Sequence, residues 1–452
     1  MPASSSPVTV LGAGVAGLTA AWHLASQGVP VRVIERDSRV GGMAVTLERD
    51  GYRFDLGPHR FHTEDRAILR LIQMLLGDEL LFCQRSSRIH LNGRYLDYPP
   101  SVPSLVRSVS PGTSLRCLYD YARIALPLRN GHATEADFET WMVNRFGRHL
   151  YDLYFGPYTC KVWGRDPSLL SVELARRRIT VPSLADVLLR LMISSKKEPG
   201  PYVTGFLYPK DGIGRIGQRL AEEVVSRRGE IHLEHEVEMV HVHAGRIVGL
   251  TVQHKGESHT LTCERVISTL PLPVLIRCLD PPPGDRVGAA AAALNFRALL
   301  YVFLMVDGPP LTREHWLYFP ELHIPFNRLT EPRNFSVGHA PAGKTSLCAE
   351  VTCDVDDAVW RLSPEALIEQ TIEHLARVGL LDPARVEGSF TQRTRWGYPL
   401  YVVGYERYLE RLVAHIAGIE NLITCGRQGG FDYSNMAKAM ASGLDTARKL
   451  GP

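Results

Sequence analysis

The 452-residue chain lacks the features that mark metal centres, secreted proteins and membrane proteins. Its eight cysteines are scattered without a Cys-x-x-Cys pair, which indicates neither a zinc site nor a disulfide framework and favours a reducing, cytoplasmic compartment. No apolar run approaches the roughly 20 residues of a membrane span, and the longest, 298–306, is expected to be a central strand. No basic region precedes the first apolar run, so no signal peptide is predicted.

The chain also lacks an excess of charge of either sign. Lysine and arginine number 51 against 48 aspartates and glutamates, and the net charge of +3 is too small to indicate nucleic-acid binding. With 45% hydrophobic residues, a chain of this length can bury a large core and is expected to form two or three domains, as a soluble enzyme does. An amphipathic stretch, 184–192, is expected to pack against the protein rather than on a membrane.

Residues 8–42 carry the strongest signal in the chain. A buried strand over 8–11 leads into Gly-x-Gly-x-x-Gly, and helical spacing follows over 18–26. A second strand over 29–34 ends in Glu35, at about the ~20-residue offset where an acid binds ribose hydroxyls. The glycines allow the tight turn, the approach of a pyrophosphate to the helix N-terminus and close helix packing, in the order Gly12, Gly14 and Gly17.

The order of these elements predicts a dinucleotide site, and the residues after the acid narrow the choice of dinucleotide. An ordinary strand-to-helix turn can also contain three such glycines, but the second strand and the acid make that interpretation the weaker one. Arg36 and the pair Gly41 and Gly42 resemble the Glu-Arg-x-x-x-x-Gly-Gly extension of FAD-binding members of this fold. FAD is therefore expected rather than NAD, with Ala16 and Met43 as further contacts.

Helical and strand patterns alternate along the rest of the chain without an internal repeat or a linker, so the domains are expected to be interleaved. The predicted fold class is α/β, with a Rossmann-type FAD-binding domain interleaved with a helical domain and a β-sheet substrate domain. The FAD-binding domain is expected from the separate segments 1–62, 205–285 and 415–452. The segment 63–204 is expected to be mainly helical, and 286–414 to be β-rich.

This order of elements resembles that of the FAD-dependent amine oxidase superfamily, which includes protoporphyrinogen oxidase, phytoene desaturase and UDP-galactopyranose mutase. The resemblance covers nearly the whole chain. It implies a backbone contact to adenine near Val237 and a loop at Gly426 beside the flavin. It also implies that Asn435 and Met436 open the last helix, whose N-terminus favours the electron-rich pyrimidine edge of the flavin.

Five motifs are most similar to the mutase branch of that superfamily: GPHRF at 57–61, YTCKVWG at 158–164, HWLYFPELHIPFNR at 315–328, GYP at 397–399 and FDYSN at 431–435. The resemblance implies that a histidine lies against the isoalloxazine ring and that several residues contact the substrate. The histidine is His59, and the substrate contacts are Tyr98, Trp163, Arg178, Tyr318, Arg328, Tyr398, Tyr433 and Asn435.

The residue types suit a phosphorylated sugar. Two guanidiniums from different segments, Arg178 and Arg328, can grip two phosphates through paired hydrogen bonds, and tyrosines offer a flat face for a base or a sugar. The alternative is that Arg178 belongs to a solvated face over 176–178 and Arg328 to a surface turn. His59 also has an alternative, as a loop histidine packed near the core.

In the mutases that the chain resembles, N5 of reduced FAD is the nucleophile, so no Ser-His-Asp set and no metal are needed. The leading hypothesis is a flavin-dependent pyranose/furanose ring-size isomerase of a nucleotide-linked sugar, with NAD(P)H as a candidate reductant. Its expected catalytic residues are His59, Arg178 and Arg328. The alternatives are a FAD-dependent oxidase or dehydrogenase, and a flavin-binding protein with a scaffolding role.

The chain departs from the mutase pattern at several positions. Thr159 replaces an asparagine, Ser101 a glutamine and Phe335 a tyrosine whose hydroxyl would face phosphate. The run near the flavin reads Asn435, Met436, Ala437. Each lost hydrogen bond could contribute about 0.5–1.5 kcal/mol, so the preferred sugar and nucleotide stay open.

Overall fold

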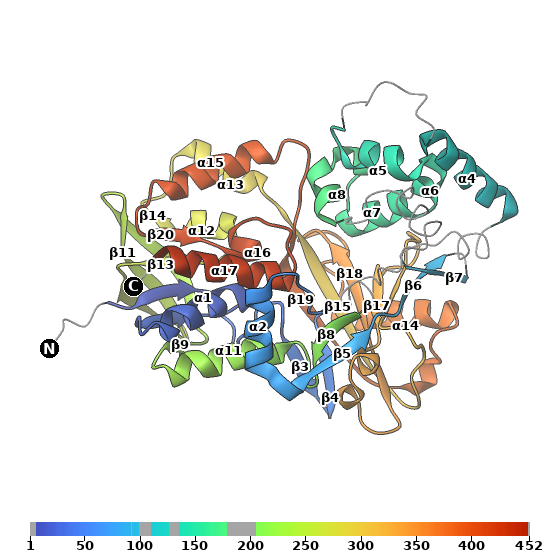
Figure 1. Ribbon diagram of the computed structural model, residues 1–452, viewed down its shortest axis with the longest axis horizontal. Coiled ribbons are helices and arrows are strands. Elements are labelled where there is room, and N and C mark those ends of the chain that lie inside the picture. The colour runs from blue at the N-terminus through green and yellow to red at the C-terminus, as the bar shows by residue number, and fades with distance from the viewer. Residues whose placement is uncertain (1–5, 92, 99–109, 126–134, 179–204, 451–452) are drawn as a thin grey trace.

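The computed structural model describes residues 6–91, 93–98, 110–125, 135–178 and 205–450. Ser101 and the amphipathic stretch lie outside these residues. The chain forms a mixed α/β structure in which three bodies are visible (Figure 1). The first body contains mainly the blue, green and red segments, a group of teal helices forms a second body, and a large sheet that is mostly orange forms the third.

The first body is built on a five-stranded parallel sheet in the order β20-β13-β1-β2-β9. Its strands come from segments far apart in the sequence: β1 and β2 lie near the N-terminus, β9 and β13 follow about two hundred residues later, and β20 lies near the C-terminus. The bounds are β1 (Val8–Leu11), β2 (Val31–Ile34), β9 (Glu230–His232), β13 (Val266–Ser268) and β20 (Leu422–Thr424). The predicted strand 8–11 is therefore correct, whereas β2 starts two residues later than predicted, after Gly28 turns the chain with φ +76°.

Three helices pack with this sheet: α1 (Val15–Ser26), α11 (Gly214–Ser226) and α17 (Met436–Leu450). The first helix starts at Val15, directly after the glycine turn, rather than at the predicted residue 18. The helices α1 and α17 approach closely because α17 has a glycine, Gly443, at the contact. A Cβ added to Gly443 would lie 2.1 Å from the carbonyl oxygen of Ala16. The last helix is thereby held against the first.

A seven-stranded sheet forms the third body, in the order β19-β15-β18-β17-β16-β6-β7. Every residue of β15 (Phe296–Val306) is buried, which confirms the central strand predicted over 298–306. The helix α14 (Pro364–Arg377) packs on one face of the sheet and is capped by Ser363, whose Oγ accepts a hydrogen bond from the Ala366 amide at 3.2 Å. The other strands are β6 (Ser87–Leu91), β7 (Arg94–Asp97), β16 (Trp316–Tyr318), β17 (Arg328–Thr330), β18 (Thr345–Cys353) and β19 (Val386–Pro399).

The expectation that 63–204 is mainly helical is wrong for its first part. After α2 (Arg66–Leu76), the strands β6 and β7 join the large sheet, and β5 (Leu80–Gln84) pairs with β8 (Gly205–Pro209). These strands are short, and the pairings of β5 with β8 and of β6 with β16 join segments far apart in the sequence, so local patterns do not place them in a sheet. The helices begin after residue 110: α4 (Pro111–Ala125), α5 (Phe138–Phe146), α6 (Arg148–Leu150), a π-helical turn (Tyr151–Phe155), α7 (Gly156–Trp163) and α8 (Val172–Arg178).

The remaining elements surround the first sheet. A four-stranded sheet has the order β12-β11-β10-β14, and a two-stranded sheet pairs β3 with β4. Among the described residues, no helix is long and apolar enough to cross a membrane. The bounds are β3 (Thr46–Arg49), β4 (Tyr52–Asp55), β10 (Glu236–His243), β11 (Arg246–His254), β12 (Glu257–Thr262), β14 (Leu279–Asp280), α12 (Leu272–Cys278), α13 (Asp285–Ala293), α15 (Glu406–Ala417) and α16 (Gly426–Gly429).

The close helix contact predicts the effect of a single methyl group. Gly443→Ala forces α17 away from α1, and we expect it to lower the free energy of unfolding by roughly 1–3 kcal/mol in urea. The matched control is Gly288→Ala in α13, where an added Cβ meets no atom within 4 Å. That change should be neutral or stabilising by up to about 1 kcal/mol, since alanine favours a helix over glycine. Equal stability of the two variants would contradict the helix-contact argument.

Candidate cofactor and substrate site

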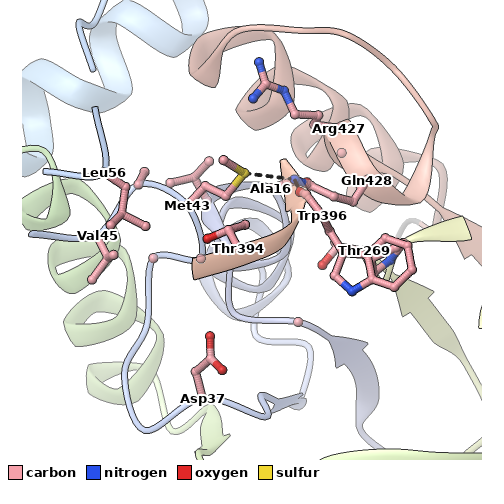
Figure 2. A pocket seen from close by; sticks show the side chains of 18 of the residues that line it. Ala16, Asp37, Met43, Val45, Leu56, Thr269, Thr394, Trp396, Arg427 and Gln428 are labelled. Atoms are coloured by element: carbon pink, nitrogen blue, oxygen red, sulfur yellow. Dashed lines mark hydrogen bonds between the residues drawn. The ribbon is translucent and has the colours of Figure 1, made fainter. Parts of the chain in front are cut away.

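A cavity of about 940 Å³ lies between the parallel five-stranded sheet and the seven-stranded sheet. Its lining includes Gly12, Glu35 and Thr269, each of which directly follows one of the parallel strands. Gly426 lines it close behind a fourth strand, β20. The carboxyl edge of a parallel sheet is where ligands bind in open α/β folds. Residues of β19 form the opposite wall, and Thr394 and Trp396 face the same space (Figure 2).

At the turn before α1, Gly12 and Gly14 line the cavity with backbone atoms that no side chain covers. Gly12 has φ +100°, and a Cβ there would lie 2.2 Å from Oγ1 of Thr269. An added Cβ on Gly14 meets no atom within 4 Å, so this residue faces open space at the start of α1. A Cβ on Gly42 would lie 3.1 Å from the Gly14 Cα, and one on Gly17 would lie 2.1 Å from the Gly12 carbonyl oxygen. The residues present therefore fit a pyrophosphate held at a helix N-terminus.

Glu35 is held in place by the turn that it follows. Its Oε2 accepts a hydrogen bond from the Ala13 amide at 2.6 Å, and its Oε1 accepts one from the Asp37 amide at 2.9 Å. Burial raises the pKa of Glu35, although these two amides oppose the shift. Arg36 and Val237 also line this end of the cavity, as the sequence predicts for residues near the ribose and adenine.

The C-terminal motif closes the cavity from the other side. Oδ1 of Asn435 accepts a hydrogen bond from the Lys438 amide at 2.9 Å, so Asn435 caps α17, which starts at Met436 as predicted. Gln428 was not predicted from the sequence. Its Nε2 donates to the Trp396 carbonyl oxygen at 3.1 Å and lies 3.3 Å from Sδ of Met43 (Figure 2). Its position two residues after Gly426 is the one signal that could have identified it.

Arg328 lies in a buried network rather than in a surface turn. Strands β17 and β18 place it directly opposite Glu350, with which it forms an ion pair, and its Nη2 donates to the Tyr398 hydroxyl at 3.2 Å. Nδ2 of Asn327 donates to the same carboxylate at 3.1 Å. Burial alone would lower the pKa of Arg328, but the Glu350 carboxylate outweighs it and raises the pKa. The pair carries no net charge.

The loop that carries His59 touches this network. Gly57 has φ +86°, and a Cβ added there would lie 2.8 Å from Oε2 of Glu350. His59 lines the cavity, and its Nδ1 has no hydrogen-bond partner among the described residues. Burial, and then the charges of Arg427 and Arg328, lower the pKa of His59 to about 3. The imidazole is therefore neutral at physiological pH and can donate or accept a hydrogen bond.

The predicted substrate contacts fall into two groups. Tyr398, Tyr433, Asn435 and Arg328 line the cavity. Tyr98 and Tyr318 lie beyond Arg328, with ring centres 4.7 Å apart, and are not part of this lining. The backbone of Arg178 ends α8, and its side chain lies outside the described part of the chain.

Two aromatic residues differ from the sequence prediction. Trp163 is fully buried, and its ring lies 5.9 Å from Tyr398 and 5.5 Å from Tyr433, so it supports these side chains from behind. Phe335 is also buried, against Tyr208 at 5.0 Å, and does not line the cavity. A tyrosine at this position would therefore not face a ligand in the cavity.

Comparisons with known proteins place the chain among flavoproteins. The family model described as flavin containing amine oxidoreductase matches residues 15–450. A probable UDP-galactopyranose mutase of Klebsiella pneumoniae is 27% identical over 176 residues, which cover 38% of this chain and 44% of that protein. A zeta-carotene-forming phytoene desaturase of Myxococcus xanthus is 28% identical over 306 residues, which cover 61% of this chain and 55% of that protein. The matches thus span less than two thirds of either relative.

Solved structures show the same fold over the full length. The crystal structure of reduced UDP-galactopyranose mutase superimposes with a TM-score of 0.85 at 23% identity and covers 99% of this chain and 95% of that one. The fold is therefore shared with a protein crystallised under that name, and it also supports other chemistries.

The buried ion pair predicts a strong and non-additive effect on stability. Arg328→Ala leaves the Glu350 carboxylate buried without its partner, and we expect a loss of about 3–5 kcal/mol in the free energy of unfolding. Adding Glu350→Gln to this variant should recover part of that loss, because the uncompensated charge is gone. Urea unfolding of both variants measures the difference, and a double variant less stable than Arg328→Ala would contradict the pairing.

The lowered pKa of His59 predicts how stability depends on pH. Between its ordinary value of 6.5 and about 3, the unfolded chain binds a proton at this residue and the folded chain does not. Stability therefore falls as the pH falls through this window, by up to roughly 1.4 kcal/mol per pH unit. His59→Gln should flatten the curve between about pH 6 and about pH 4.5 in urea unfolding. Parallel curves for the two proteins would contradict the prediction. Burial raises the pKa of Asp55 to about 6, but its effect on stability is the same in both proteins and cancels when the two curves are compared.

Proposed function

Because the chain belongs to the family of flavin-containing amine oxidoreductases, we propose that it binds FAD in the cavity and interconverts the pyranose and furanose forms of a nucleotide-linked sugar. The observation that carries this proposal is the uneven distribution of acidic residues along the cavity. The acids of the lining, Glu35, Asp37 and Glu236, gather at the end expected for the adenosine, where Arg36 lies within salt-bridge distance of Asp37 and Glu236. Around His59 the described lining holds arginines and no acid, and Figure 2 shows Asp37 and Arg427 at opposite ends.

A wall of arginine and tyrosine suits a phosphorylated sugar and repels a cationic amine. Arg427 lies 5.4 Å from the Tyr398 ring and 5.3 Å from the Tyr433 ring, and its Nε donates to the Ser434 carbonyl oxygen at 2.9 Å. It has no carboxylate partner among the described residues, so its charge is available to an anionic ligand. A cationic amine would be repelled by this charge.

The chain's own residues have roles in binding and orientation. When bound in its reduced form, FAD supplies a nucleophilic nitrogen, N5, to the reaction. The glycines before α1 hold the pyrophosphate, and the capped start of α17 lies at the flavin end. Tyr398 and Tyr433 cover the sugar and exclude water, and Arg427 adds positive charge to the wall that faces an anionic ligand. His59 offers a neutral hydrogen bond and adds no charge.

A second candidate is a FAD-dependent oxidase or dehydrogenase, and the phytoene desaturase match over 61% of the chain supports it. Such an enzyme would take electrons from the substrate and pass them to an acceptor. Arginines in the cavity serve no purpose for an apolar hydrocarbon, since their charges would have to be desolvated without compensation. The charge of the wall therefore favours the isomerase.

The decisive experiment compares the two flavin states. The purified flavoprotein is incubated with UDP-, GDP- and TDP-linked hexoses, with and without dithionite, and the products are separated by chromatography. We expect a furanose product with the reduced flavin alone and no net consumption of reductant per turnover. A reaction that proceeds with oxidised FAD and reduces it stoichiometrically would overturn the isomerase in favour of the dehydrogenase.

A further inference from the structure

Two arginines beside the cavity share one aromatic ring. Arg60 directly follows His59 and lines the cavity, while Arg85 lies between β5 and β6. Their Cζ atoms lie 5.8 Å and 5.6 Å from the centre of the Trp316 ring. The second guanidinium also lies 5.0 Å from the Tyr98 ring. Because β6 pairs with β16 in parallel, with Ser87 opposite Trp316, the sheet itself sets this arrangement.

Neither guanidinium has a carboxylate within salt-bridge distance among the described residues. The polar contact of Arg85 is with Ser87, whose Oγ accepts from Nε at 3.4 Å. Burial and the neighbouring charge of Arg85 lower the pKa of Arg60, which shows that the two cations oppose each other. Elsewhere in the chain, clustered arginines share an acid, as Arg215 and Arg219 do with Glu79. Two close cations without an acid are stabilised when an anion binds between them.

Arg328 cannot supply this charge, because Glu350 already neutralises it. A nucleoside diphosphate carries at least two negative charges, so its phosphates need cations that are not already paired. Arg60 lines the cavity and its Cζ lies 5.8 Å from the centre of the Trp316 ring, so the phosphates of one ligand can extend from the cavity towards that ring.

From these contacts, the geometry points to Arg60 and Arg85 as a diphosphate-binding pair that Trp316 holds in place. The face of the indole attracts both guanidiniums, whose planar N–H donors can bind phosphate oxygens in pairs. The proposal that an oxyanion binds here depends only on Arg60 and Arg85, which have no carboxylate partner among the described residues. That the diphosphate belongs to a nucleotide sugar rests on the proposed function.

Calorimetric titration of the flavin-loaded protein with sodium pyrophosphate and with UDP tests both parts. We expect Arg60→Leu and Arg85→Leu each to weaken binding of the two ligands by about tenfold or more, since each removes charged hydrogen bonds. Arg60→Lys, which keeps the charge without the fork, should bind with intermediate affinity. The control is Arg70→Leu on α2, an exposed arginine away from the site, which should bind like wild type. The flavin absorbance spectrum reports whether each variant retains a folded cofactor site.

The outcomes separate the two proposals. If wild type binds pyrophosphate but not UDP, and the leucine variants lose it, the oxyanion site stands and the nucleotide substrate falls. If wild type binds UDP and the Arg60 and Arg85 variants bind it equally well, the arginine pair is overturned and the proposed function stands. If wild type binds neither ligand, both are overturned.

Discussion

The structure depends on how closely backbone segments approach one another at the carboxyl edge of the parallel sheet. A Cβ at Gly12 would overlap Thr269 after β13, and one at Gly426 would lie 2.8 Å from the Cβ of Ala16. Gly443 brings the last helix against the same alanine. These contacts join the first, middle and last parts of the chain, so the glycine turn serves both the fold and the cavity. A methyl group at any of these positions would disturb both.

A second constraint acts on the far wall, where a buried ion pair orders the substrate side. Asn327, Tyr398 and Gly57 all contact or approach the Glu350 carboxylate that neutralises Arg328. Retaining a buried pair costs desolvation energy and is weak evidence for stability, so its value here lies in orientation. It holds the His59 loop against β18, where burial lowers the pKa of the imidazole and keeps it neutral. The remaining positive charge is then carried by arginines that have no acid beside them.

Local sequence patterns predict the part of the fold that local chemistry determines. The glycine turn, Glu35 and the wholly buried β15 lie where the sequence places them, because each is specified by neighbouring residues. The strands β6 and β7 pair with each other as neighbours in the sequence, but their place in the large sheet could not be predicted, because β6 joins it through β16, more than two hundred residues away. Glu350 was missed for the same reason, since only the register of β17 and β18 places it opposite Arg328. Trp163 matches a motif but is buried, which no sequence pattern distinguishes from a cavity position.

The side of the cavity that binds the dinucleotide therefore says little about the reaction. Its glycines and its acid suit a hydride-transferring enzyme as well as an isomerase, and the shared fold reflects this. The opposite wall discriminates, because guanidiniums without a carboxylate beside them attract an anionic ligand. Arg60 illustrates the point: in the sequence it is one polar residue in a loop, and beside Trp316 and Arg85 it becomes a charge without a counterion. The proposed chemistry of this chain therefore rests on the charge of that wall and not on the glycine fingerprint.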